Sequence, residues 1–228
     1  NCILLTAIAT GIIMLLSVVL VRPLLVMLNT PASIIDWCYS YLMIMFLGFV
    51  GCAYYNILSG VLRGLGDAFS ALVYLLVSTV LNIILDLLFV AKLGMGVSGV
   101  AWATIIAQAV SAVLCFIRMA KLTDIFDLKL HYMKYNKKFS GKIIKLGLPS
   151  GLTQAIFSMA MIVVQSLTNS FGEMFISANV IVMRVDGFAM LPNFSFGSAM
   201  TTYAGQNVGA RKYERVIRGA KQGTLVAV

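Results

Sequence analysis

The stretch Leu81-Asn82-Ile83-Ile84-Leu85-Asp86 places two polar side chains inside an apolar run that extends from Phe69 to Ala91. A helix rises about 1.5 Å per residue, so a run of this length can cross the hydrocarbon core of a bilayer. Asn82 and Asp86 are four residues apart and would therefore lie on one face of that helix. Because an ionisable side chain in such a run is costly, Asp86 marks a candidate functional site.

The composition of the whole chain is that of a membrane protein. Of its 228 residues, 61% are hydrophobic and 11% are charged, and the mean hydropathy is +0.97. Soluble globular proteins are about 45–50% apolar and about 25% charged. The sequence therefore predicts an all-α membrane protein, a polytopic bundle of transmembrane helices.

Six apolar segments are long enough to span a bilayer, and a seventh begins near the last residue. They are approximately Cys2–Val21, Ile34–Leu62, Phe69–Ala91, Val97–Ile117, Lys142–Phe171, Glu173–Gly205 and Gly219–Val228. We expect Gly205-Gln206-Asn207-Val208-Gly209-Ala210 to form a turn. We also expect this sequence to be a piece of a longer protein, with no signal peptide to remove.

The basic residues indicate how the segments are oriented. The net charge is +9, and 14 of the 17 lysines and arginines fall at Arg63, within Arg118–Lys145 or within Arg211–Lys221. If successive segments alternate in direction, these three clusters lie on one side, which the positive-inside rule places in the cytoplasm. The positive charge therefore indicates membrane topology and not nucleic-acid binding.

The connection between the fourth and fifth segments divides the chain. We expect residues 1–118 to form one group of helices and residues 142–228 to form a second. Residues 119–141 would be a basic linker on the cytoplasmic side. Its apolar residues fit an amphipathic segment on the inner leaflet, where lysines meet anionic headgroups, and a solvated linker is the alternative.

The tight turn Gly94-Met95-Gly96 relates two neighbouring helices. Positions equally far from Met95 would lie at equal depth, which pairs Asp86 with Thr104 and Asn82 with Gln108. A carboxylate buried in this way either takes up a proton or pairs with a cation. Hydroxyl and carboxamide oxygens are suitable neutral ligands for a hard cation such as Na⁺. The alternative is that these groups only hydrogen-bond the helices to one another.

Four further polar residues are candidate accessory positions, namely Ser78, Gln108, Arg184 and Asp186. Arg184 and Asp186 are two residues apart and so do not share a helix face. They would line a cavity or bridge neighbouring helices. The sequence contains no nucleophile–base pair and no metal-ligand cluster, so we expect no enzyme activity, no catalytic residue and no cofactor other than a coupling ion.

Several motifs in this order resemble the multidrug and toxic compound extrusion (MATE) family. The first group is Gly60-Val61-Leu62-Arg63-Gly64-Leu65-Gly66-Asp67, the stretch from Leu81 to Asp86, and Gly94-Met95-Gly96-Val97-Ser98-Gly99-Val100-Ala101-Trp102-Ala103-Thr104-Ile105-Ile106-Ala107-Gln108. The second group is Lys145-Leu146-Gly147-Leu148-Pro149, Met190-Leu191-Pro192 and the stretch from Gly205 to Ala210.

The resemblance implies a fragment that runs from about the third to the ninth helix of a twelve-helix transporter with two pseudo-symmetric lobes. It implies a cation site at Asn82, Asp86 and Thr104, which a carboxylate on the first helix would complete. Phe157 stands where some members have a glutamate on the seventh helix. The pattern is therefore more similar to the DNA-damage-inducible (DinF-like) branch.

The activity that follows is secondary active efflux of small organic, often cationic, molecules across the cell membrane in exchange for Na⁺ or H⁺. The intact protein would be a monomer in the lipid bilayer. A lipid-linked oligosaccharide flippase of similar fold is one alternative. A membrane scaffold or receptor module without transport activity is another, from a different class.

Overall fold

The computed structural model describes residues 2–27, 34–122 and 136–227, and every regular element among them is a helix. This confirms the predicted all-helical class. The chain divides into two compact units, Asn1–Ser140 and Gly141–Val228. Most of the predicted linker, including the segment expected to be amphipathic, lies outside the described residues.

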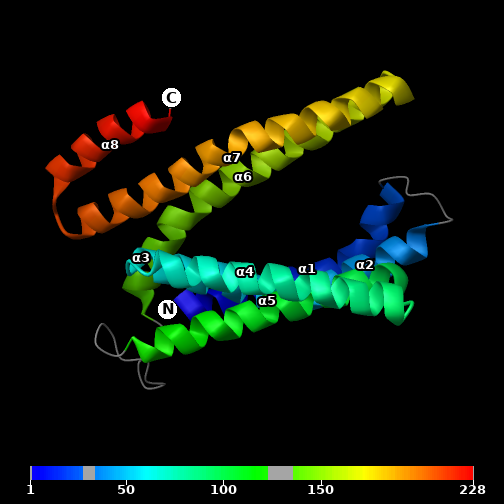
Figure 1. Cartoon of the computed structure of the whole chain (residues 1–228), viewed down its shortest axis with the longest axis horizontal. Helices are drawn as coiled ribbons and strands as arrows, with labels where there is room; N and C mark the ends of the chain where they lie inside the picture. The colour runs from blue at the N-terminus through cyan, green and yellow to red at the C-terminus, as the bar shows by residue number, and fades with distance from the viewer. Residues whose placement is uncertain (1, 28–33, 123–135, 228) are drawn as a thin grey trace. The chain divides into compact units, whose positions relative to one another are not determined.

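The first unit is built around one helix, α5. Its elements are α1 (Cys2–Met27), α2 (Ile35–Leu47), α3 (Phe49–Gly64), α4 (Ala68–Asp86), the π-helix η1 (Leu87–Lys92) and α5 (Gly96–Lys121). Helix α5 contacts α2, α3, α4 and η1, and Figure 1 shows α4 and α5 running alongside each other. The buried face of α5 consists largely of small residues, which let helix backbones approach closely in a membrane: Gly99, Ala101, Ala103, Ala107, Ser111 and Ala112.

The second predicted span is bent. Helices α2 and α3 meet at Gly48 with an angle of 44° between them. A side chain at Gly48 would collide with Ile105 of α5. Glycine at this position therefore lets α5 lie against the bend.

The second unit contains α6 (Lys137–Ser170), which begins just before the unit boundary, α7 (Glu173–Gly209) and α8 (Tyr213–Ala227). The expected turn at residues 205–210 is wrong, because α7 stays helical to Gly209. The chain then reverses through Arg211, which has a φ of 58°. Helix α8 packs on α7, and side chains at Gly219 and Gly223 would collide with Tyr203 and Met200.

Among the described residues, five helices are long and apolar enough to cross a membrane, and the bent pair α2–α3, counted as one span, makes a sixth. This number agrees with the six predicted spans. Helix α8 has 15 residues and is not among them, and it carries Arg215, Arg218 and Lys221. The basic stretch after the sixth span is therefore helical from Tyr213 onward, and Arg211 and Lys212 precede the helix.

Candidate cation site between α4 and α5

The helix face that carries Asn82 and Asp86 ends where the helix changes its hydrogen-bonding pattern. Asp86 is the last residue of α4, and η1 follows it directly. In this segment the N–H of Leu93 donates to the carbonyl oxygen of Leu88 at 3.0 Å, five residues back. Such π-helical segments are rare and often occur at functional sites.

Asn82 and Thr104 are brought together. The Nδ2 atom of Asn82 lies 3.5 Å from the Oγ1 atom of Thr104, which is a long hydrogen bond. The Thr104 hydroxyl in turn donates to the carbonyl oxygen of Val100 at 2.9 Å. Asn82 uses its amide nitrogen in this contact, so its carbonyl oxygen remains available as a ligand.

This pairing differs from the predicted register, which placed Asp86 opposite Thr104. A second contact gives the same register as the first, because the Ser111 hydroxyl donates to the carbonyl oxygen of Tyr74 at 2.8 Å. Asp86 therefore stands one helical turn further toward the 94–96 turn than expected. Equal counting about Met95 fails for two reasons. The turn is centred nearer Gly94, because η1 ends at Lys92 and α5 begins at Gly96, and η1 has more residues per turn than an α-helix.

The same register places Ser78 opposite Gln108. Ser78 is buried, with 4% of its surface exposed. Gln108 lies on the Thr104 face of α5, one turn away from it toward the Arg118 end. The hydroxyl of Ser78 and the carboxamide of Gln108 therefore share one level of the α4–α5 interface.

Two oxygen atoms in this interface are buried and have no hydrogen-bond donor among the described residues. They are Oδ1 of Asp86 and Oε1 of Gln108. An unsatisfied buried acceptor costs about 1–3 kcal/mol, and more when it is charged. Both atoms are therefore positions where a bound cation, or a proton on the carboxylate, would offset an existing cost.

The arrangement suits a small hard cation better than a transition metal. Within the described ranges, no group of three or more His, Cys, Asp or Glu side chains is placed to hold a metal ion. One carboxylate at Asp86 and the neutral oxygens of Asn82 and Thr104 make up the candidate ligand set. Neutral oxygens with a single carboxylate are appropriate for a monovalent ion, which needs little compensating charge.

The remaining candidate residues belong to the other unit. Arg184 and Asp186 are exposed on α7. In the part of the chain that the structure describes, no hydrogen bond or ion pair joins them. They are not part of the α4–α5 interface.

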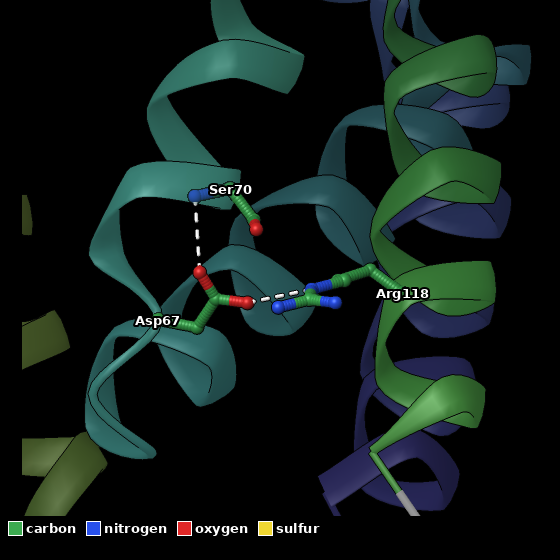
Figure 2. A network of polar contacts seen from close by, with 3 residues as sticks. All are labelled: Asp67, Ser70 and Arg118. Atoms are coloured by element: carbon green, nitrogen blue, oxygen red, sulfur yellow. Dashed lines mark hydrogen bonds and ion pairs between the residues drawn. The ribbon is translucent and has the colours of Figure 1, made fainter.

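A polar cluster that the sequence did not reveal lies at the other end of α4. Asp67 accepts a hydrogen bond from the backbone N–H of Ser70 at 3.1 Å and so caps α4. Its second oxygen accepts from Nε of Arg118 on α5 at 2.7 Å, as Figure 2 shows. Gly66, with a φ of 94°, closes α3 and brings Asp67 into this position.

Opposing effects act on the Asp67 carboxyl. Burial favours its neutral form, but the hydrogen bonds from Ser70 and the Arg118 guanidinium outweigh burial, and together they hold the pKa of Asp67 below its usual value. The N-cap could be anticipated from an aspartate three residues before Ser70. The pairing with Arg118 could not, because it depends on the register of α4 and α5.

The first unit also contains an apolar cavity of about 460 Å³ between α3 and α5. Tyr54, Leu58 and Phe116 are among its lining residues, and none of the candidate site residues lines it. Its wall offers almost no polar atoms that could bind a cation. The candidate cation site is therefore assigned from the polar groups of α4 and α5.

Comparison with known proteins places the chain in a family. The model of the MatE family matches residues 1–88 and 149–228. The probable multidrug resistance protein YpnP of Bacillus subtilis is 34% identical over 195 residues, which cover 85% of this chain and 43% of that protein. The multidrug export protein MepA of Staphylococcus saprophyticus is 25% identical over 180 residues, covering 79% of this chain and 40% of that protein.

The fold is also that of solved transporters. An outward-facing multidrug resistance MATE family transporter of the MOP superfamily matches 99% of this chain and 49% of its own, with a TM-score of 0.87 and 25% identity. The chain spans less than half the length of the curated relatives described above. On these matches, the chain belongs to the MatE family of multidrug and toxic compound extrusion proteins, which are multi-pass membrane transporters and not enzymes.

Proposed function

We propose that the protein containing this chain exports small organic, often cationic, molecules in exchange for Na⁺ or H⁺, and that Asp86 binds the coupling cation. The observation that carries the proposal is the buried Oδ1 atom of Asp86, which has no donor among the described residues. The names of the relatives as multidrug resistance and export proteins support the efflux of drugs.

Asn82 and Thr104 would supply the neutral ligands beside Asp86. Their side chains are already in contact, and Asn82 lies one turn from Asp86 on the same helix face. A cation at Asp86 neutralises the carboxylate and uses the carbonyl oxygen of Asn82. These neutral ligands fit Na⁺, and protonation of Asp86 alone would serve an H⁺-coupled exchanger.

Coupling requires that the cation bind two states of the transporter with different affinity, because a ligand shifts an equilibrium only by its differential binding. In the predicted topology the 94–96 turn faces the outside, so the cation reaches Asp86 from that side. Its binding favours the state that releases the exported molecule outward. Removal of the charge at Asp86 therefore uncouples efflux from the ion gradient.

The wider setting is also part of the proposal. The chain would correspond to about the third to the ninth helix of a monomeric transporter in the cell membrane, with the residue 119–141 linker in the cytoplasm. Phe157 of α6 stands where some members of the family have a glutamate, which supports placement in the DNA-damage-inducible branch. A further carboxylate from a helix outside this sequence would close the cation site.

The test is Asp86→Asn in the full-length protein, expressed in cells that lack their own efflux pumps. Wild-type protein should export a cationic dye when the ion gradient is intact, and export by the variant should fall at least about tenfold, as expected for loss of an interaction worth about 1.4 kcal/mol or more. Asp36→Asn, at an exposed carboxylate in the first turn of α2, is the matched control. Unchanged gradient-dependent export by Asp86→Asn would remove the basis for the proposal.

A further inference from the structure

The second unsatisfied oxygen of the α4–α5 interface belongs to Gln108. Its Oε1 atom is buried and has no donor among the described residues. Gln108 lies one turn from Thr104, on the side away from Asp86. Ser78, which is almost fully buried, stands opposite it in the register that the Asn82–Thr104 and Tyr74–Ser111 contacts establish.

Interhelical hydrogen bonding does not account for this oxygen. A carboxamide that holds two helices together needs a donor for its carbonyl oxygen, and none of the described residues supplies one. An apolar side chain of the same size would fill the position without a buried unsatisfied atom. The oxygen is therefore available to a ligand that the described residues do not supply, and a cation is one such ligand.

We propose that Gln108 and Ser78 form a second, uncharged Na⁺ position one helical turn beyond the Asp86 site, and that this position makes the transporter prefer Na⁺ to H⁺. The inference rests on the proposed function, because it assumes that a cation enters at Asp86. Carboxamide and hydroxyl oxygens bind Na⁺ through their dipoles. They do not take up a proton near neutral pH, so only the Na⁺-coupled reaction would depend on them.

The Asn82–Thr104 contact, which lies between the two proposed cation positions, would allow Na⁺ to pass from one to the other. The Asn82–Thr104 hydrogen bond separates Asp86 from Gln108 along the interface. At 3.5 Å it is long and therefore weak, so a cation with its own oxygen ligands can replace it at low cost. Na⁺ would then move from a charged position to a neutral one, from which it is released more easily.

The experiment uses purified full-length protein and the variant Gln108→Met, which keeps the length of the side chain and removes its oxygen. The midpoint of thermal unfolding is measured in Na⁺ and in K⁺ at constant ionic strength. We expect Gln108→Met to unfold in K⁺ at the wild-type temperature or above it, because an unsatisfied atom has been removed. Its apparent affinity for Na⁺ should fall about tenfold, which corresponds to the loss of one good ligand.

Transport gives the second readout. Export driven by a pH gradient should stay within about twofold of wild type in Gln108→Met, and export driven by a Na⁺ gradient should fall about tenfold. Ser78→Ala should also lower the apparent affinity for Na⁺ and the export driven by a Na⁺ gradient. This second variant keeps the proposal testable if Gln108→Met folds poorly. Asp86→Asn should lose the Na⁺ response entirely.

Four outcomes would overturn the inference. The first is a wild-type protein with no Na⁺ response, and the second is a variant at Gln108 that keeps the full response while Asp86→Asn loses it. The third is a lower unfolding temperature of Gln108→Met in K⁺, which would show a structural hydrogen bond. The fourth is an equal loss of Na⁺-driven and H⁺-driven export. Only an Asp86→Asn variant with intact coupling would also remove the proposed function.

Discussion

At the scale of single residues, Asp67 illustrates how one carboxylate can serve two structural purposes. One oxygen caps α4 through the backbone of Ser70, and the other pairs with Arg118 of α5. The Arg118 side chain is 40% exposed, so solvent screens the ion pair and its contribution is small. The cap should therefore account for most of the stability that Asp67 contributes.

Two substitutions separate these contributions. Asp67→Ala loses both the cap and the ion pair and should lower the free energy of unfolding by about 1–2 kcal/mol. Asp67→Asn keeps a capping side chain and should cost less than about 0.5 kcal/mol. Unfolding of the full-length protein in detergent measures both. Equal losses in the two variants would mean that the ion pair, and not the cap, dominates.

Wild type and Asp67→Asn should also differ in how their stability depends on pH. Because the pKa of Asp67 is lowered in the folded state, its charged form contributes stability at pH values above the usual carboxyl range. That stability is lost as the pH falls through the folded-state pKa. Below a pH of about 4, wild type should therefore lose its advantage over Asp67→Asn, and an advantage that grows on acidification would contradict this assignment.

At this scale, a candidate residue could be singled out from the sequence where its chemistry alone was unusual. Asp86 stands out because a charge inside an apolar run is unusual, whatever its neighbours are. The Asp67–Arg118 pair did not stand out, because both residues also fit a turn and a cytoplasmic positive cluster. Their pairing depends on how two helices are aligned, and local sequence does not encode that alignment.

At the scale of the helices, close approach depends on glycine at particular positions. Gly48 stands at the bend between α2 and α3, against Ile105. Gly99 faces η1, and a Cβ atom added at Gly99 would lie 3.1 Å from the Cβ atom of Phe89. The spans themselves were predictable, because length and hydropathy determine them. The bend and the π-helix were not, because hydropathy does not distinguish one helical hydrogen-bonding pattern from another.

Gly48→Ala tests the close approach at the bend. The added methyl group collides with Ile105, and overpacking of this kind costs about 1–3 kcal/mol of stability. Gly60→Ala in α3 is the matched control, since no atom of the described chain lies within 4 Å of its new Cβ. Helix propensity predicts that Gly60→Ala is neutral or stabilising by up to about 1 kcal/mol. A smaller loss for Gly48→Ala than for the control would contradict the packing assignment.

The turn between α7 and α8 carries an avoidable strain. Arg211 has a left-handed backbone, which costs a residue other than glycine about 1–2 kcal/mol. Arg211→Gly relieves this cost but loosens the unfolded chain, so we expect a net gain of about 0.5–1 kcal/mol in unfolding free energy. Ala210→Gly, at a neighbouring residue with a φ of −82°, should instead lose about 0.5–1 kcal/mol. A loss of stability in Arg211→Gly together with a gain in Ala210→Gly would contradict the observed backbone.

At the scale of the whole molecule, the chain supplies one carboxylate and several neutral oxygens to an interface between two helices of its first unit. The family could be identified from ordered motifs, although each motif alone is short. The predicted pairing of Asp86 with Thr104 is wrong by one helical turn. The prediction counted residues equally on both sides of Met95 and assumed regular α-helix on each side. The contact between Asn82 and Thr104 replaces it and leaves Asp86 nearer to the 94–96 turn.

We propose that Asp86 couples cation entry to export. The direct measurement is gradient-driven transport by purified full-length protein in proteoliposomes, with a Na⁺ gradient or a pH gradient imposed separately. Wild type should move a cationic dye against its concentration under at least one gradient, and Asp86→Asn should transport no faster than without a gradient. Gradient-driven transport at the wild-type rate by Asp86→Asn would contradict the account.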